Sequence, residues 1–250
     1  MGSVRTDAEH GVRAAGATSD RLRQALLLLR PTARSMRWAA VVGAAAGALL
    51  VAWRSSQTLS VGGPPSLAPI RMAAVLLCLG ASFMLDDEAG VTVEPAVASL
   101  AVRRGLRLAL GLLAIGAAWA ATLVVASGSA HRGVEAGSLP AAGLTLEAAA
   151  LLAVTLAAGA VATRSLGHGN GGVAAGPMLL AFVAGAVAIR PYWSLFPGGR
   201  IDPEWVPAHL RWTAILGGAT IVLVWTSLDP ARRSAAARGR RWIRRTRRRR

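Results

Sequence analysis

The sequence predicts an all-α polytopic integral membrane protein, a bundle of six transmembrane helices with both termini in the cytoplasm. Hydrophobic residues make up 54% of the 250 residues and charged residues only 16%, against about 25% charged in typical globular chains. The apolar residues gather in long runs. All 28 basic residues are arginine, and most of them lie between those runs. A disordered chain is excluded, because disorder requires a sequence poor in apolar residues.

Six segments have the length and composition of membrane-spanning helices. About 20 mainly apolar residues are needed to cross a hydrocarbon core of about 30 Å, where no water satisfies the backbone. We expect the spans at residues 36–53, 67–85, 106–126, 144–163, 173–193 and 212–228. Pro177 and the glycines before it are expected to shorten the helical part of the fifth span.

The distribution of arginine predicts how the spans are oriented. Basic residues near the ends of spans stay on the cytoplasmic side. With six spans and a cytoplasmic N-terminus, 22 arginines lie inside and six outside, and the six are Arg54, Arg71, Arg132, Arg190, Arg200 and Arg211. Trp193, Trp205 and Trp212 are expected at the outer interface, where tryptophan is enriched. The chain is therefore expected to be a multi-pass protein of the plasma membrane.

The two ends of the chain are polar and flank the membrane domain, which we place at residues 36–228. Residues 1–35 form a cytoplasmic arm in which Leu22, Ala25, Leu26 and Leu29 recur with helical spacing, as in a helix lying on the membrane. A frayed, solvated arm is the alternative. Residues 229–250 carry 11 arginines and one acid, and this tail is expected to bind anionic membrane lipids and no nucleic acid.

Arg71 and Glu147 are the candidate polar residues within the membrane. Arg71 lies about five residues from the outer end of the second span, where its side chain can extend to the outer headgroups. The alternative is that Arg71 lines an aqueous translocation path. Glu147 begins the fourth span at the outer side, where a carboxylate favours a helix N-terminus.

The connection between the second and third spans is the most informative polar stretch. Pro95 can begin a helix along the membrane surface, and a basic group then leads into the third span. We predict a segment that docks on a partner supplying force, with a surface connector that binds no partner as the alternative. The candidate residues are Asp86, Asp87, Glu88, Glu94, Arg103, Arg104 and Arg107.

Several sites are excluded or unsupported by the sequence. The chain has no lysine, so it lacks the phosphate-binding lysine of a Walker A nucleotide site. Residues 167–172 match GxGxxG but follow a membrane helix, and we interpret them as a turn. No catalytic residue, cofactor or metal site is expected. Gly43 and Gly47 form a surface of small residues that permits another helix to approach closely, within the chain or across a dimer, and contact within the chain is the leading interpretation.

Three strings resemble the permease subunits of ABC transporters of the ABC-2 type, in the alanine- and arginine-rich style of actinobacteria. They are Leu85-Asp86-Asp87-Glu88 followed by Arg103, Arg104 and Arg107; Asp202-Pro203-Glu204-Trp205 followed by His209, Arg211 and Trp212; and Leu228-Asp229-Pro230-Ala231-Arg232-Arg233. The likeness covers nearly the whole chain, although none of the strings is a catalytic signature.

The resemblance implies partners and roles for particular segments. The partners are a second copy of the permease, or a related permease, and separate cytoplasmic ABC ATPase subunits. The connection 86–107 would contain the coupling helix, and residues 22–29 the amphipathic gate helix. The chain departs from the family between its fifth and sixth spans, where the polar, proline-rich residues 190–211 replace an evident re-entrant hairpin.

We therefore expect a non-catalytic permease subunit that moves an unknown substrate by alternating access in the export direction, driven by ATPase subunits on other chains. A non-transporting membrane scaffold or immunity-type protein is the alternative from a different class. A membrane enzyme acting on lipid is the third hypothesis, and it would depend on Asp202, Glu204 and His209 at the outer face.

Overall fold

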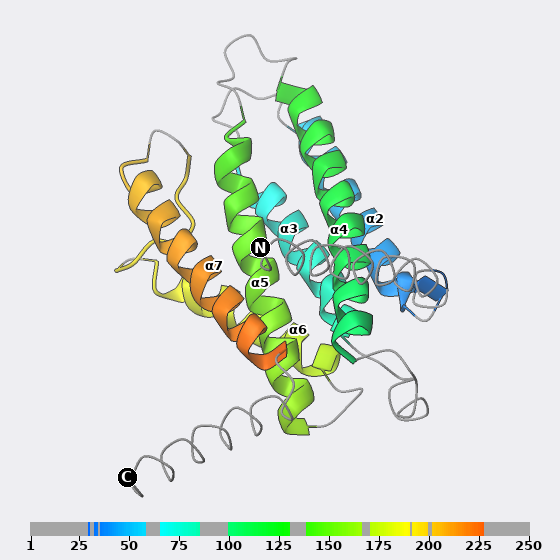
Figure 1. Cartoon of the computed structure of the whole chain (residues 1–250). Coiled ribbons are helices and arrows are strands. Elements are labelled where there is room, and N and C mark those ends of the chain that lie inside the picture. The colour runs from blue at the N-terminus through cyan, green and yellow to red at the C-terminus, as the bar shows by residue number, and fades with distance from the viewer. Residues whose placement is uncertain are drawn as a thin grey trace, which may run out of the picture.

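The computed structural model describes residues 36–58, 66–85, 100–130, 139–166, 171–190, 192–199 and 202–227, together with residues 30, 33 and 34. Within the described part of the chain the regular structure is helical and no strand occurs. Consecutive helices run in opposite directions through one bundle (Figure 1). Five of the helices are long and apolar enough to cross a membrane, which makes the chain a multi-pass membrane protein by length and composition.

Six α-helices and one short 3-10 helix account for the predicted spans. Their bounds are α2 Trp38–Thr58, α3 Ala68–Ala81, η1 Ser82–Leu85, α4 Leu100–Ala130, α5 Ala141–Leu166, α6 Gly171–Ala188 and α7 Trp205–Ser227. The surface helix expected at 22–29, the arm 1–35 except for residues 30, 33 and 34, and the tail 229–250 lie outside the described residues.

The second span differs from the other five in being short. Helix α3 has 14 residues, and its first turn contains Pro69. Proline is tolerated there because the N–H groups of the first turn have no acceptor within the helix. It continues directly into η1, and the apolar helical stretch Ala68–Met84 is shorter than the five long helices. The described residues thus contain five helices of full spanning length, and crossing by α3 remains an expectation.

The fifth and sixth spans depart from their predicted bounds. Helix α6 has 18 residues and is shorter than the predicted span, but it begins at Gly171 and continues through Pro177, so the shortening is not at those residues. It ends at Ala188 instead of residue 193, just before the Pro191 that disfavours a continuing helix. Helix α7 begins at Trp205, two turns earlier than expected, and this brings His209 and Arg211 into the helix.

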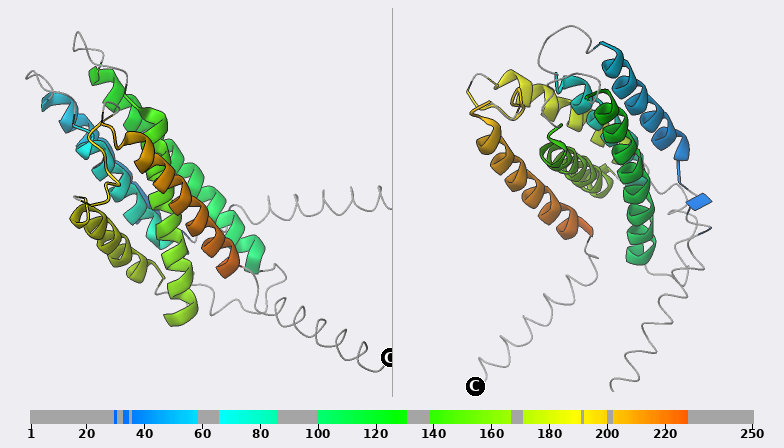
Figure 2. Two further views of the ribbon diagram at one scale, coloured as in Figure 1. Left: turned by 90° about the vertical axis from the view of Figure 1, so that its left-hand side faces the viewer. Right: turned by 90° about the horizontal axis from the view of Figure 1, so that it is seen from above.

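The bundle consists of two groups of helices joined mainly through α3 and η1. Helices α2, α3 and α4 pack against one another, and α5 packs against both α6 and α7. Most backbone contacts between the groups involve α3 or the following η1, which touch α5 and α6. Helix α4 adds a side-chain hydrogen bond, from Trp119 to Thr145 of α5. The view from above shows α2 and α4 on one side of the molecule and α7 on the opposite side of α5 (Figure 2).

Small residues set the closest helix contacts. A Cβ atom on Gly80 would lie 2.5 Å from the Cβ of Ala44 and 3.0 Å from the carbonyl oxygen of Ala40, so α2 and α3 meet at this glycine. Gly43 has nothing within 4 Å of such a Cβ, and Gly47 meets only the side chain of Leu76 at 3.6 Å. The close packing predicted for Gly43 within the chain was therefore wrong.

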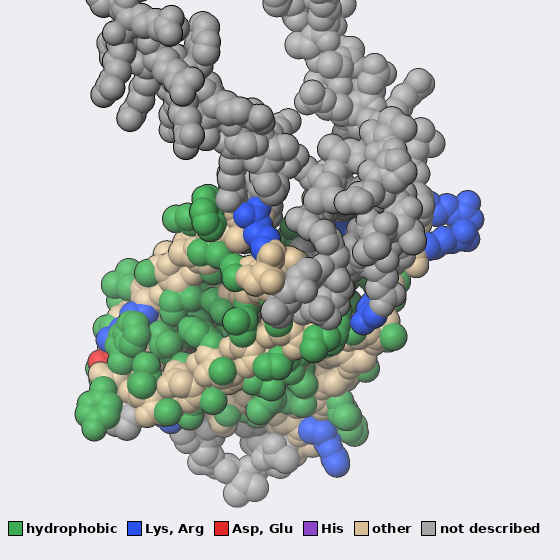
Figure 3. Space-filling model, turned by 90° about the horizontal axis from the view of Figure 1, so that it is seen from below, with side chains coloured by type: hydrophobic (Ala, Val, Ile, Leu, Met, Phe, Trp, Pro, Cys, Tyr) green, Lys and Arg blue, Asp and Glu red, His purple; other side chains and the backbone are tan. Residues whose placement is uncertain are grey.

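The outer surface of the bundle is apolar, as a lipid-facing surface must be. Large hydrophobic side chains are exposed on several helices, among them Leu113 of α4, Leu210 and Ile221 of α7 and Val173 of α6. Seen from below, hydrophobic side chains cover most of the described surface, and arginines stand at a few separate places (Figure 3). Helix α5 is the exception, because it lies at the centre of the bundle and more than half of the residues in its apolar stretch are buried.

Candidate functional site

Two charged side chains predicted to lie within the spans bind each other. Arg71 Nε donates to Glu147 Oε2 at 2.7 Å, and Arg71 Nη2 donates to Glu147 Oε1 at 2.8 Å. This bidentate arrangement matches the planar guanidinium to the carboxylate. The Glu147 side chain is 2% exposed and the Arg71 side chain 14%. Arg71 therefore does not extend alone to the headgroups, because its charge is neutralised inside the bundle.

The positions of both residues follow from the helices that carry them. Arg71 lies in the first turn and a half of α3, and its backbone N–H bonds to the carbonyl oxygen of Leu67. Glu147 lies almost two turns into α5, which begins at Ala141. It is therefore too far from the helix end to act as the N-terminal acid expected from the sequence, and its partner comes from another helix.

The segment between α6 and α7 folds back onto the ion pair. Arg71 Nη1 donates to the carbonyl oxygen of Pro197 at 2.7 Å, and the Arg71 guanidinium lies 5.4 Å from the ring centroid of Phe196. Trp212 is fully buried beneath the same segment, and its Nε1 donates to the carbonyl oxygen of Leu195 at 2.7 Å. Trp212 is therefore buried in the core of the bundle, and it does not face the lipid as a residue of an interfacial aromatic belt would.

A third ionisable residue, His209 of α7, completes the charge cluster of Arg71, Glu147 and His209. Its Nε2 lies 3.7 Å from Glu147 Oε1, and its Nδ1 lies 2.7 Å from the carbonyl oxygen of Trp205. The Trp205 and His209 rings are tilted against each other with centroids 4.2 Å apart. A Cβ on Gly143 would meet both rings, so the imidazole occupies space that only glycine leaves open.

The polar residues nearest the end of the bundle have partners of their own. Asp202 accepts from the backbone N–H groups of Gly198 and Glu204, and these bonds lower the pKa of its carboxyl. Glu204 pairs with Arg211 at 3.0 Å, with its side chain 47% exposed. The three residues proposed for a lipid-modifying enzyme therefore have separate partners, since His209 faces Glu147.

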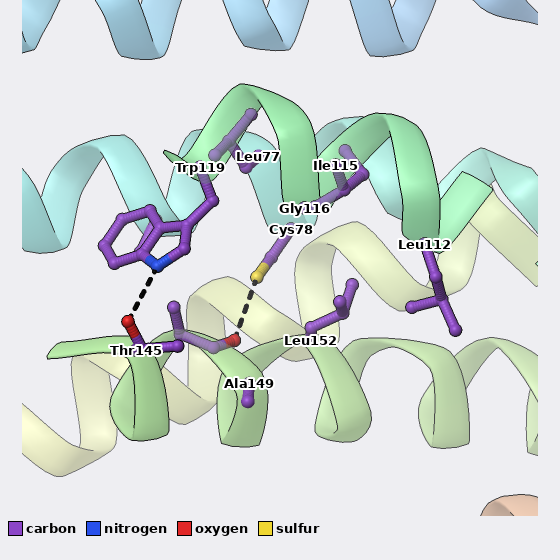
Figure 4. A pocket seen from close by; sticks show the side chains of 11 residues that line it. Leu77, Cys78, Leu112, Ile115, Gly116, Trp119, Thr145, Ala149 and Leu152 are labelled. Carbon is purple, nitrogen blue, oxygen red and sulfur yellow. Dashed lines mark hydrogen bonds between the residues drawn. The ribbon is translucent and has the colours of Figure 1, made fainter. Parts of the chain in front are cut away.

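An apolar cavity of about 170 Å³ lies between α3, α4 and α5. Its lining is almost entirely hydrophobic, and Leu77, Ile115 and Leu152 come from the three different helices (Figure 4). The polar atoms at its edge are paired, since Trp119 Nε1 donates to Thr145 Oγ1 at 3.1 Å. Binding sites for drug-sized molecules occupy about 300–1,000 Å³, so this cavity alone is too small for such a ligand.

Only the end of the candidate coupling segment, from residue 100 on, lies within the described residues. Asp86, Asp87, Glu88 and Glu94 lie outside the described residues. Arg103 and Arg104 belong to the first turns of α4, and their side chains are not described. Arg107 is 4% exposed within α4, so it is part of the bundle and is not a solvated basic anchor on the surface.

The sequence identified Arg71 and Glu147 separately and missed their pairing. His209 was noted only as part of the outer polar group, because the sixth span was expected to begin after it. Asp202 and Pro203, just before α7, are a sequence signal for this earlier helix start. The Trp205 N–H bonds to the carbonyl oxygen of Asp202 there. A helix beginning there carries His209 one turn into the bundle.

The geometry thus combines a charge cluster from three helices with an adjoining apolar cavity. Within the described residues no group of three or more histidine, cysteine or acidic side chains could hold a metal ion. The chain matches no protein-family model, no curated protein and no solved structure.

Proposed function

We propose that this protein is the membrane-spanning permease subunit of an ATP-driven transporter of the ABC-2 type, located in the plasma membrane. Separate cytoplasmic ATPase subunits supply the energy, and a second copy or a related permease completes the translocation path. The sequence resemblance suggests this class, and the absence of lysine requires that a Walker A site belong to another chain.

The observation that carries the proposal is the place of α3 in the bundle. Helix α3 and η1 make most of the backbone contacts between the two groups of helices. They also directly precede residues 86–107, the predicted coupling segment. A push on that segment would therefore move the element that holds the two groups together. Alternating access requires such a connection, because a partner must favour one packing of the helices over another.

The polar contacts are distributed unequally along the bundle. The charge cluster links α3, α5 and α7 near the end where α3, α5 and α7 begin. Farther along α5 and α7, Ala153, Ala157 and Ala219 form a small apolar cluster. Apolar contacts between small side chains lack the directional bonds of an ion pair, so they suit sliding or rocking while the charge cluster stays closed.

Copurification and ATPase activity test the proposal together. Tagged chain, expressed with its neighbouring genes, should capture a P-loop ATPase, and the complex in proteoliposomes should hydrolyse ATP. Asp87→Arg in the predicted coupling segment should reduce both capture and hydrolysis. Glu204→Gln alters the exposed ion pair between Glu204 and Arg211, at the end of the bundle where α3 begins and away from the coupling segment. It is the matched control and should leave both capture and hydrolysis unchanged.

Three outcomes separate the competing functions. Capture of no P-loop ATPase would contradict the transporter assignment. Capture without ATP hydrolysis by the complex would favour the membrane scaffold or immunity-type alternative. Loss of a lipid-modifying activity in His209→Ala, with Arg71 and Glu147 intact, would favour the membrane enzyme.

A further inference from the structure

The imidazole of His209 has one nitrogen paired and one nitrogen without a hydrogen-bond partner among the described residues. Nδ1 faces the carbonyl oxygen of Trp205 at 2.7 Å. A carbonyl oxygen only accepts, so Nδ1 carries a hydrogen and donates it. Nε2 is buried and makes no hydrogen bond within the described structure. A buried polar atom in this condition requires an explanation, since nearly all such atoms are paired.

The tautomer assignment leaves a lone pair directed at a carboxylate. In neutral imidazole one nitrogen carries hydrogen and the other accepts, so a hydrogen on Nδ1 leaves Nε2 as an acceptor. Its nearest charged atom is Glu147 Oε1, at 3.7 Å. Two acceptors then face each other without a hydrogen between them, which is unfavourable in a site shielded from water.

We propose that His209 and Glu147 form a proton-binding site, with the proton held by His209 Nε2 and shared in a hydrogen bond with Glu147 Oε1. Protonation turns Nε2 into a donor while the Nδ1 bond to Trp205 is kept, because both nitrogens of the imidazolium donate. Glu147 Oε1 accepts from Arg71 Nη2, and its second lone pair remains for His209. Closing 3.7 Å to a normal hydrogen bond needs a movement of less than about 1 Å.

The charged groups around the site come from three parts of the chain. From α3, Arg71 neutralises Glu147. From the segment before α7, Asp202 carries a negative charge that interacts with both Arg71 and Arg190. Glu204 and Arg211 neutralise each other at the rim. Arg71, Arg190, Glu147 and Asp202 sum to no net charge, so the attraction for the proton comes from Glu147 Oε1, the carboxylate oxygen that faces Nε2.

Proton binding would connect the end of α7 to the other helices. In the neutral state α7 touches the charge cluster only through an unbonded contact, whereas the protonated imidazole joins α7 to α5 and, through Glu147, to α3. Binding of the proton therefore draws the start of α7 toward α5. This inference depends on the cluster alone and holds whether or not the chain transports anything.

Nuclear magnetic resonance of imidazole nitrogens tests the site directly. The full chain, labelled at histidine and purified in detergent, is titrated over about pH 5 to 8, the range in which histidine changes charge. The signals lost in His209→Gln belong to His209. At the basic end they should show hydrogen on Nδ1 and a bare Nε2, and at the acidic end hydrogen on both. Hydrogen on Nε2 at the basic end would overturn the proposal.

Thermal unfolding supplies a second readout on the same samples. If the folded chain binds the proton more tightly than the unfolded chain, stability falls as the pH rises through this range. The wild type should lose thermal stability on going from about pH 5.5 to 8, and His209→Gln should lose most of that dependence while keeping the Arg71 pair. His131→Gln is the matched control and should behave as the wild type. An equal pH dependence in all three proteins would overturn the proposal.

Gly143→Ala tests whether the position of the His209 ring matters, because the histidine itself is kept. The added methyl group meets the His209 and Trp205 rings, so it displaces the imidazole without removing a titratable group. The variant should lose the pH dependence as His209→Gln does. Retention of the full dependence would show that the proton is held without Glu147, and the site would be rejected.

Discussion

At the scale of single residues, the Arg71–Glu147 pair shows how a membrane bundle accommodates charge. Both partners are largely removed from solvent, and each oxygen of Glu147 accepts one N–H of Arg71. Arg71 also donates to the Pro197 carbonyl oxygen. The pair therefore satisfies donors and acceptors that would each be costly alone in a low-dielectric interior.

Removing one partner of this pair should destabilise the protein strongly. Glu147→Gln leaves the guanidinium of Arg71 buried without its counter-charge, and we expect a loss of about 3–5 kcal/mol in unfolding free energy. Glu204→Gln breaks an ion pair whose acid is 47% exposed, and it should cost no more than about 1 kcal/mol. Denaturant unfolding of the detergent-solubilised variants provides the comparison.

A double replacement distinguishes charge from packing in the same experiment. Arg71→Met with Glu147→Leu removes both charges and keeps apolar volume, so it should recover much of the stability that Glu147→Gln loses. If the double variant is as unstable as the single one, the Arg71 contacts with Pro197 and Phe196 matter more than the buried charge does.

Arg71 and Glu147 could be chosen as candidate residues from the sequence, but the ion pair between them could not be predicted. Arg71 and Glu147 stand out because few ionisable residues interrupt the apolar runs. Which face of each helix they occupy depends on the rotation of α3 against α5, and no local pattern reveals that rotation. Pro197 and Leu195 contribute through backbone oxygens, which leave no mark on residue type.

At the scale of elements, hydropathy predicted where the helices are and was less accurate about where they end. Helix α7 starts earlier than its apolar run because Asp202 accepts the Glu204 N–H and its carbonyl oxygen accepts the Trp205 N–H. Such hydrogen bonds at helix starts are set by polar residues that a hydropathy window discounts. Pro177 lies inside α6 without ending it.

Helix α3 and η1 together reach approximately the thickness of the hydrocarbon core. At 1.5 Å per residue the 14 residues of α3 extend about 21 Å. The four residues of η1, at about 2.0 Å each, add about 8 Å. The tighter 3-10 winding thus gives a short segment more length per residue, which is compatible with the crossing expected for the second span.

Two glycines in neighbouring helices offer a matched test of helix packing. In Gly80→Ala the new methyl group meets Ala44 and the Ala40 carbonyl oxygen, so α2 must shift, and we expect a loss of about 1–3 kcal/mol. Gly43→Ala adds a methyl group with nothing within 4 Å and should change stability by less than about 1 kcal/mol. Equal losses in unfolding experiments would contradict the α2–α3 contact at Gly80.

At the scale of the whole molecule, the two groups of helices and the arginine distribution together predict sidedness. Arg54 lies near the end of α2 and Arg164 near the end of α5. With α3 crossing the membrane, these residues face opposite sides. If α3 does not cross, the chain makes one membrane crossing fewer between Arg54 and Arg164, and the two residues then face the same side.

Cysteine labelling in intact cells should separate these two arrangements. Cys78 is buried, and Cys78→Ala provides a background without thiols. Arg54→Cys on that background should react with a membrane-impermeant maleimide in intact cells, whereas Arg164→Cys should react only after permeabilisation. Labelling of both in intact cells would show that α3 does not cross, and labelling of Arg164→Cys alone would invert the orientation.

The peripheral position of α7 affects how the protein is made in the cell. Helix α7 packs closely on α5 and is the last of the described helices to leave the ribosome. Arg71 and Glu147 are synthesised earlier, so they can neutralise each other while the translocon still holds the growing chain. Helix α7 then docks on α5 after that pair has formed, and His209 is the last of the three residues to reach the charge cluster.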